Sequence, residues 1–248
     1  MTPLHRDLSA LGDRLAAWSP PQGAFDPLAA WALSYARHGL VPTPGGAPGG
    51  APTGSLRVAL TPAGDRLTLQ VSEAVQAGFT TLTTDAEIAC AQDALLTPRS
   101  WSLNLRWQTG LPSGAAHGEL DQTRSGRADG KTLVFKAAKE RRRDAPKRWT
   151  SFWSLFAAVQ RLPFAVSSSL SFDLFDELEL HKPGQRLAYI GPQPVALGGG
   201  TLHLHVFEQT GRGVLPWRWW LDGQHRVLLA AGGRRAYLLE SAKSGGAA

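Results

Sequence analysis

Hydrophobic and polar positions alternate along the chain from residue 56 onward, at the period of two that is typical of β-strands. Leu56, Val58 and Leu60 share one side of the first such segment, and residues 67–71 alternate in the same way. Between them, residues 63–65 are Ala-Gly-Asp, which favour a tight turn. Because successive side chains of a strand point to opposite faces, this region predicts a β-hairpin with one buried face.

The same alternation recurs toward the C-terminus. Trp101 and Leu103 lie on one face of the next predicted strand, and Ser102 lies on the other. A second hairpin is expected over 119–135, with its polar, glycine-bearing tip at 125–130. Further strands are predicted at 169–175, 186–190, 201–209, 217–221, 226–230 and 235–240, with turns at 182–184, 198–200 and 222–223.

A helical period of three to four residues occurs in three places. Leucines at positions 4, 8, 11 and 15 line one face of an N-terminal helix. Asp-Pro at 26–27 is a good cap and first-turn pair for a second short helix over 28–35. The strongest pattern is at 152–162, where Pro163 ends the helix.

These periods divide the chain into parts. Residues 1–41 are expected to form a helical appendage, and residues 42–54 a Pro/Gly linker whose composition cannot pack a core. Residues 55–240 form the predicted β-rich main domain, followed by a flexible tail at 241–248. Because many short strands joined by tight turns curl into barrels or half-barrels, the predicted fold is mainly β. We expect a curved, barrel-like antiparallel sheet with one packed helix.

Composition agrees with a turn-rich globular protein, since the 248 residues are 43% apolar and include 27 Gly and 17 Pro. The formal charge of +6 makes the protein basic, which can indicate a nucleic-acid partner. However, Glu140 and Asp144 interrupt the basic run at 136–148, and no aromatic residue alternates with its charges. We therefore expect a solvated loop or helix entry there, and no nucleic-acid binding.

The single cysteine, Cys90, excludes an internal disulfide and a cysteine-based metal cluster, and its apolar neighbours predict a buried, inert thiol. No apolar stretch reaches the roughly 20 residues of a transmembrane helix. Residues 1–18 carry charges and lack the apolar core of a signal peptide. The protein is therefore expected to be extracytoplasmic if a leader was removed, and cytoplasmic otherwise.

Two histidines form the first candidate site. His203 and His205 are two positions apart in a predicted strand, so their side chains point the same way. Paired imidazoles can transfer protons or bind a divalent metal such as zinc. A metal needs a third ligand, which the local sequence does not supply on that face. The alternative is two half-exposed histidines on a polar sheet face.

The second candidate is the aromatic segment 216–220, which reads Pro-Trp-Arg-Trp-Trp. Trp217 and Trp219 would share one strand face, with Arg218 on the other. Indole offers a flat surface for sugars or apolar ligands, so these three residues are the predicted ligand-binding set. The alternative, that both tryptophans fill the core, fits the burial that is usual for large aromatic residues.

The segment 213–229, with its tryptophan-rich strand, Asp-Gly turn and returning apolar strand, is similar to the closing strands of bacterial extracytoplasmic half-barrel proteins. These clam-like proteins include the lipoprotein-sorting type and related domains of unknown function. The resemblance covers the last third of the chain and implies a concave apolar face that binds a lipid-like or other hydrophobic ligand. The chain is expected to depart from them in its N-terminal helical segment, and residues 1–18 do not fit the pattern of a leader peptide.

Together these observations favour non-enzymatic binding of an apolar or lipid-like ligand on a concave sheet face, with no cofactor. The alternative is a small-molecule or carbohydrate-active lyase or hydrolase that uses His203 and His205, with a divalent metal such as zinc if any. A third possibility is a structural protein that binds a partner. The expected ligand is a hydrophobic or sugar-like small molecule, and the oligomeric state stays open.

Overall fold

The computed structural model of the protein describes residues 8–42, 49–110, 118–197 and 200–244. Within these ranges fifteen strands form one sheet, and the helices are α2 (Gly12–Ala17) and α3 (Phe152–Val159). No helix in this part of the chain is long and apolar enough to cross a membrane. The strands are β1 (Trp31–Gly39), β2 (Pro52–Ala63), β3 (Arg66–Ala77), β4 (Thr80–Ala91), β5 (Pro98–Thr109), β6 (Gly118–Asp129), β7 (Thr132–Lys136), β8 (Glu140–Asp144), β9 (Trp149–Ser151), β10 (Ser169–Asp176), β11 (Leu180–Leu197), β12 (Gly200–Thr210), β13 (Trp217–Leu221), β14 (Val227–Gly232) and β15 (Arg235–Ser244).

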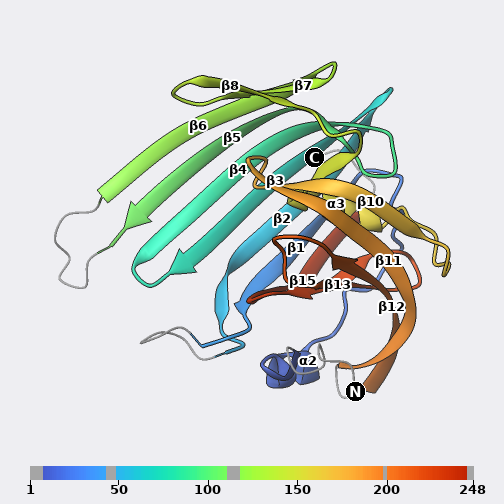
Figure 1. The fold of residues 1–248 in the computed structure, drawn as a ribbon. Helices are drawn as coiled ribbons and strands as arrows, with labels where there is room; N and C mark the ends of the chain where they lie inside the picture. Colours follow the sequence, from blue (N-terminus) through green and yellow to red (C-terminus); the bar gives the residue numbers. More distant parts are fainter. Residues whose placement is uncertain (1–7, 43–48, 111–117, 198–199, 245–248) are drawn as a thin grey trace.

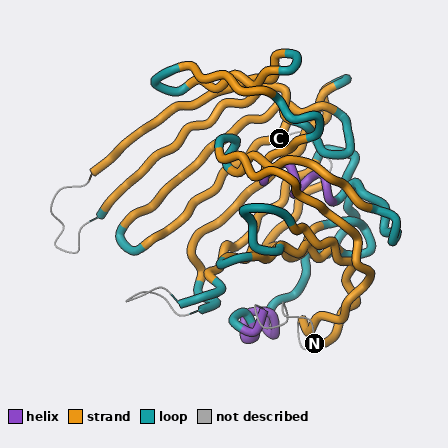
Figure 2. The backbone as a smooth tube through the Cα atoms, in the orientation of Figure 1, coloured by secondary structure: helices purple, strands orange, loops and turns teal. Residues whose placement is uncertain are grey.

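The sheet consists of two meanders that meet where β1 pairs with β15. Every other neighbouring pair is consecutive in the chain, and the order runs from β8 to β1, then from β15 to β9. All pairs are antiparallel except β9 with β10, which is parallel. The order is linear, so the sheet is not closed, and it curves around α3 (Figures 1 and 2). The predicted fold, mainly β with a curved antiparallel sheet, is confirmed.

Side chains from the two arms of the sheet meet across its open side. Trp149 of β9 packs edge-on against Trp101 of β5, with ring centroids 5.9 Å apart. Glu179, between β10 and β11, accepts hydrogen bonds from Arg124 of β6 and Arg141 of β8. Across this open side, the two meanders are therefore held together by side chains, whereas the β1–β15 ladder joins them on the other side.

Helix α3 follows the predicted helical pattern and lies at the centre of the core. Ser151 caps it, because its side-chain oxygen accepts a hydrogen bond of 3.0 Å from the backbone N–H of Ser154. At the other end, the Gln160 side chain donates to the carbonyl of Phe156 and accepts from the backbone N–H of Val227. All eight residues of the helix are buried, so the sheet encloses the helix on its concave side.

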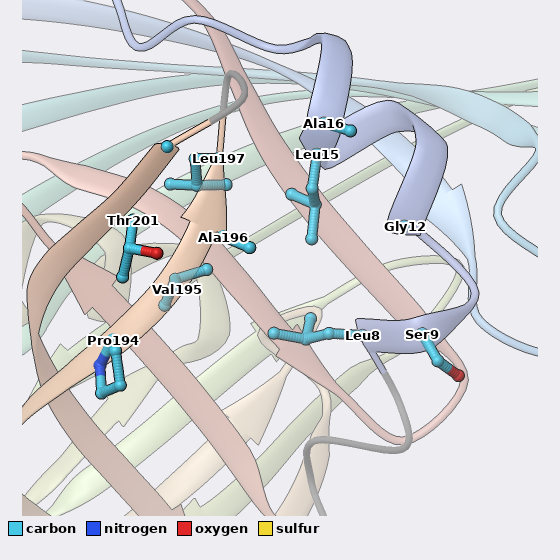
Figure 3. Close-up of a pocket in the computed structure, with 11 residues that line it drawn as sticks. Leu8, Ser9, Gly12, Leu15, Ala16, Pro194, Val195, Ala196, Leu197 and Thr201 are labelled. Carbon is cyan, nitrogen blue, oxygen red and sulfur yellow. The ribbon is translucent and has the colours of Figure 1, made fainter.

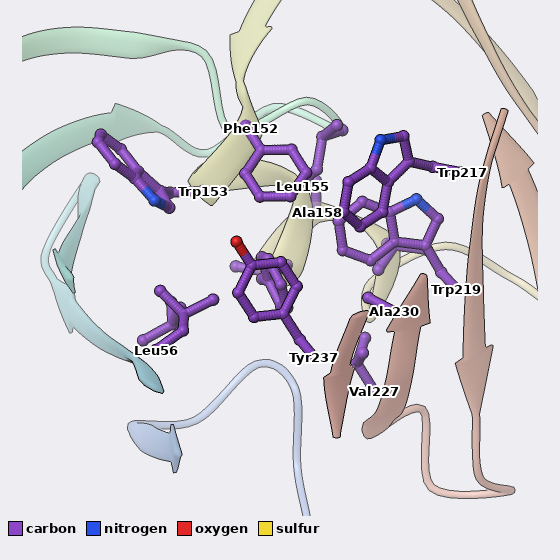
Figure 4. Packing of buried hydrophobic residues seen from close by; sticks show 14 of the residues in the cluster. Leu56, Phe152, Trp153, Leu155, Ala158, Trp217, Trp219, Val227, Ala230 and Tyr237 are labelled. Atoms are coloured by element: carbon purple, nitrogen blue, oxygen red, sulfur yellow. The ribbon is translucent and has the colours of Figure 1, made fainter. Parts of the chain in front are cut away.

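Aromatic rings from the C-terminal meander cover this helix (Figure 4). Phe156 lies 4.9 Å from Trp219 and 5.5 Å from Tyr237, measured between ring centroids, with both pairs edge-to-face. Phe152 lies 5.0 Å from Trp217. Edge-to-face pairs of this kind add specificity to the apolar burial that stabilises a core.

The helical interpretation of residues 28–35 is wrong for the part that forms strand β1. Trp31, Leu33 and Tyr35 are buried, and the residues between them are half-buried, which is the alternation of a strand. The spacing of Trp31 and Tyr35 also fits one helix face. The structure differs because β1 completes the sheet between β2 and β15, and this long-range pairing overrides the local pattern.

Parts of the predicted linker and of the predicted tail belong to strands of the sheet. Pro52 and Gly54 belong to β2, where Gly54 pairs with Arg37 of β1. Residues 241–244 extend β15 and pair with the first half of β1. Residues 43–48 and 245–248 lie outside the described residues, so the division of the chain into domains stays a prediction.

Three local predictions need correction. The turn expected at 182–184 lies inside β11, and the chain instead turns where Glu177 and Leu178 adopt φ values of 51° and 56°. The hairpin tip expected at 125–130 is shorter, since β6 continues to Asp129. The basic run contains the exposed strand β8 rather than a loop or helix entry. In each case a backbone pairing partner extends a strand through residues whose composition favours a turn or a loop.

Candidate functional site

The structure places the two predicted catalytic histidines in different surroundings. His203 is exposed on β12, opposite Pro194 of β11. His205 is half-buried, and its Nδ1 lies 2.7 Å from the hydroxyl oxygen of Tyr189. The two imidazoles share a strand face, as predicted, but only His205 is enclosed by other side chains.

His205 is instead brought together with His225, which lies between β13 and β14. Phe164 lies between them, 3.7 Å from the His205 ring and 3.9 Å from the His225 ring, nearly parallel to both. Burial lowers the pKa of His205, and burial together with the neighbouring His205 lowers the pKa of His225. This stack favours two neutral imidazoles that pack against a benzene ring.

The chemistry expected of a metal or an acid–base pair needs further groups around these rings. In the ranges that the structure describes, no group of three His, Cys, Asp or Glu side chains is placed to hold a metal ion. Asp173 and Asp176, two carboxylates on strand β10, are engaged by other side chains. Asp173 contacts His181 at 2.9 Å, and Asp176 pairs with Lys182 at 2.6 Å. Among the described residues, the hydrogen-bond partner of His205 is the Tyr189 hydroxyl, and the catalytic role of His203 and His205 stays a prediction.

The predicted ligand-binding tryptophans face the core. Trp219 is fully buried and Trp217 nearly so, and both pack on Phe152. Trp217 also lies over Gly232, where an added Cβ would overlap the indole ring. Arg218 is buried on the other face, and its guanidinium pairs with Glu208 at 2.9 Å. The concave face near these tryptophans is therefore filled by α3.

An apolar cavity of about 740 Å³ lies elsewhere, between α2 and the hairpin formed by β11 and β12 (Figure 3). Helix α2 and the turn before it contribute Leu8, Leu15 and Ala16. The end of β11 contributes Val195 and Leu197. The spacing of the N-terminal leucines predicted the helix face that lines this cavity, but no local signal linked it to β11.

A network of buried charged and polar groups was also missed. Glu73 on β3 accepts hydrogen bonds from Trp153 Nε1 at 3.0 Å and from the hydroxyl of Tyr237 at 2.7 Å. Its Oε1 lies 3.8 Å from Nε of Arg37. A sequence signal existed, because Glu73 continues the alternating series that places Val71 on the buried face. An acid at an inward position needs partners, and three surround it here.

Comparisons with known proteins add little to this geometry. No protein-family model matches the chain, and no curated protein matches it. Among solved structures, the chain is similar to a DUF1089 family protein from Pseudomonas aeruginosa, with a TM-score of 0.37 and 15% identity over 87% of this chain and 95% of that one. A likeness at this level carries no argument about the fold or the function of this chain. The lipoprotein-sorting type is not confirmed.

Proposed function

We propose that the protein binds an apolar small molecule with an acyl-like chain, without catalysis, in the cavity between α2 and the β11–β12 hairpin. The observation that carries the proposal is the size and lining of this cavity. Its volume of about 740 Å³ is in the range of small-molecule sites, which is roughly 300–1,000 Å³. Aliphatic side chains and Ala, Gly and Pro dominate its walls.

The lining matches an apolar ligand better than a sugar. Aliphatic side chains such as Leu8, Leu15, Val195 and Leu197 gain free energy when they cover hydrocarbon and offer no hydrogen bond to a hydroxyl group. Sugars are usually held by flat aromatic faces together with polar partners, and none of the described residues that line the cavity is aromatic. The ligand class expected from the sequence is therefore kept, while its proposed position moves from the face of Trp217 to α2.

The proposal is tested with N-phenyl-1-naphthylamine, a neutral probe whose fluorescence rises in apolar surroundings. Ala16 is exposed and lines the cavity, so Ala16→Trp places an indole inside it. Ala17 is the next residue, is also exposed and does not line the cavity, which makes Ala17→Trp the matched control.

We expect the wild-type protein and Ala17→Trp to bind the probe equally. Ala16→Trp should bind it about tenfold more weakly, which corresponds to ~1.4 kcal/mol. Absence of probe binding to the wild type would contradict the proposal. So would equal binding by both variants, because the probe would then occupy another place.

A further inference from the structure

A second hollow, of about 350 Å³, lies at the opposite end of strand β11. Lys182, near the start of β11, lines this hollow, while Pro194, near the end, lines the apolar cavity. Twelve residues of strand extend over about 40 Å at ~3.3 Å per residue, so the hollows are separate. The second one is bounded by β1, β10, the loop before β13 and the two-residue turn between β14 and β15.

Arg235 is the central residue of this hollow. Its guanidinium carbon lies 4.8 Å from the ring centroid of Phe152, 5.5 Å from Trp217 and 5.9 Å from Tyr237. These contacts hold the side chain against the aromatic core, and 26% of it remains exposed. A cation over aromatic faces is stabilised there, so the position of the guanidinium is fixed before any ligand arrives.

The donors of this guanidinium are unused. Arginine carries five N–H donors, yet within the described residues the Arg235 side chain makes no hydrogen bond. Its closest acidic contact is Oδ1 of Asp176 at 4.0 Å, beyond hydrogen-bond distance. Oδ2 of the same carboxylate is engaged by Lys182 at 2.6 Å. The N–H donors of the Arg235 guanidinium, which form a planar fork, are therefore free to bind a ligand in the hollow.

The charged side chains that line this hollow are mostly cationic. Besides Arg235, the hollow is lined by Arg37, Lys182 and Arg234, against the single lining carboxylate of Asp176. The Arg37 guanidinium already donates a hydrogen bond of 2.7 Å to the hydroxyl oxygen of Thr53, and it lies near the carboxylate of Glu73. Arg234 is exposed at the turn between β14 and β15. An anion entering the hollow would meet these four cations and the carboxylate of Asp176 on the wall, with the carboxylates of Glu73 and Glu177 also near the guanidinium.

The other wall of the hollow is apolar. Phe152, Leu174 and Trp217 lie toward the core, and Val214 and Leu215 belong to the loop before β13. Leu215 is 62% exposed although it borders a charged site. A fully hydrated inorganic anion gains no free energy by contacting this apolar wall. The hydrocarbon part of an organic acid does gain free energy by covering it.

We propose that this hollow binds an organic carboxylate, with its carboxylate on the fork of Arg235 and its apolar or aromatic body against Trp217 and Leu215. The planar guanidinium matches a carboxylate with two parallel hydrogen bonds. A singly charged group suits the site better than a doubly charged phosphate, because Asp176 lies beside the fork and repels additional negative charge. This site is independent of the apolar cavity.

The test is isothermal titration calorimetry of the full chain with phenylacetate, its neutral isostere phenylacetamide, and inorganic phosphate. We expect phenylacetate to bind at least tenfold more tightly than either of the other two. Arg235→Gln should abolish binding of phenylacetate. Arg234→Gln should weaken it about threefold and reduce its dependence on salt, because an exposed charge contributes mainly through screened attraction.

Two further variants keep the test decisive if Arg235→Gln fails to fold. Leu215→Ala removes exposed apolar surface and should weaken binding of phenylacetate about threefold, with the fold intact. Arg99→Gln, at an exposed arginine on β5 outside the hollow, is the matched control and should change nothing.

Several outcomes would overturn the proposal. These are no binding of phenylacetate to the wild type, equal binding of phenylacetamide, or tighter binding of phosphate. Unchanged affinity in both Arg234→Gln and Leu215→Ala would do the same. Ala16→Trp, which fills the apolar cavity, should leave binding of phenylacetate unchanged, so failure at one site can be distinguished from failure at the other.

Discussion

The indole Nε1 of Trp153 donates a hydrogen bond of 3.0 Å to Oε2 of Glu73, and this contact joins the core helix α3 to strand β3. The second carboxylate oxygen accepts a hydrogen bond from the hydroxyl of Tyr237 on β15. One side chain, which is 9% exposed, therefore connects the helix with both meanders of the sheet. Such a buried acid is tolerated because its oxygens are hydrogen-bonded and Arg37 lies nearby.

Replacing this acid should destabilise the protein strongly. Glu73→Ala leaves the Trp153 and Tyr237 donors without their acceptor and Arg37 without its counter-charge, so we expect a loss of about 3 kcal/mol in the free energy of unfolding. Urea denaturation followed by circular dichroism measures this loss. Glu87→Ala, at an exposed acid on the adjacent strand β4, is the control and should change stability by less than about 0.5 kcal/mol. Similar losses in both variants would show that the network is not stabilising.

Two glycines of β6 should differ in their tolerance of alanine. Gly126 lies beneath Trp101, and a Cβ at this position would overlap the indole ring. Gly118 has no atom within 4 Å of the same added carbon. We expect Gly126→Ala to cost about 2 kcal/mol through displacement of the ring, and Gly118→Ala to be nearly neutral. Thermal unfolding of the two variants measures the difference, and an equal effect would contradict the placement of Trp101.

Stability should depend on pH through the stacked histidines. Burial lowers the pKa of His205 and of His225 in the folded state, below the value of about 6.5 for an unfolded histidine. The unfolded chain therefore binds more protons in this window. The stabilisation is complete above about pH 6.5 and is lost as the pH falls through the folded-state pKa values.

Urea unfolding at about pH 7.5 and about pH 5.5 tests this dependence. The wild-type protein should lose more stability between the two values than His205→Gln, whose side chain does not titrate. If the variant loses as much as the wild type, His205 is not responsible. Proton NMR titration of the His205 and His225 ring protons should give pKa values below about 6.5.

The thiol of Cys90 should be inert while the protein is folded. Cys90 is fully buried, and burial raises its pKa to about 12, so little of the reactive thiolate forms. We expect no reaction with Ellman's reagent under native conditions and full reaction in concentrated guanidinium chloride. Fast modification of the folded protein would mean that strand β4 opens locally. Cys90→Ala, which cannot react, gives the baseline.

The sequence was sufficient for much of the fold because strands with one buried face carry a period-two pattern. Leu56 and Leu69 face the core as expected, and α3 begins and ends close to its predicted bounds. The inward position of Glu73 could also have been found from the same period. Each of these features depends on residues that are neighbours in the chain or in one hairpin.

Other features depend on contacts between distant segments, and the sequence alone could not show them. Trp31 and Tyr35 fit a helix or a strand equally, and pairing of β1 with β15 decides between the two. Strand β11 continues across Pro183 and Gly184 as an irregularity in the ladder, because β10 pairs with the residues on either side of them, Lys182 and Gln185. Both proposed binding sites have walls from several elements, so no single segment carried a signal for them.

The pairing of β1 with β15 sets an order for folding. Every other ladder joins strands that are close in the chain, so it closes only a short loop, whereas this one brings together the two ends of the described chain. Forming contacts between distant segments costs the most entropy and is slow. Each meander can therefore acquire its ladders early, and hydrogen exchange during refolding should show protection last at the amides shared by β1 and β15. The sheet therefore consists of two meanders whose contacts are local in sequence, and the β1–β15 ladder joins them in the last step of folding.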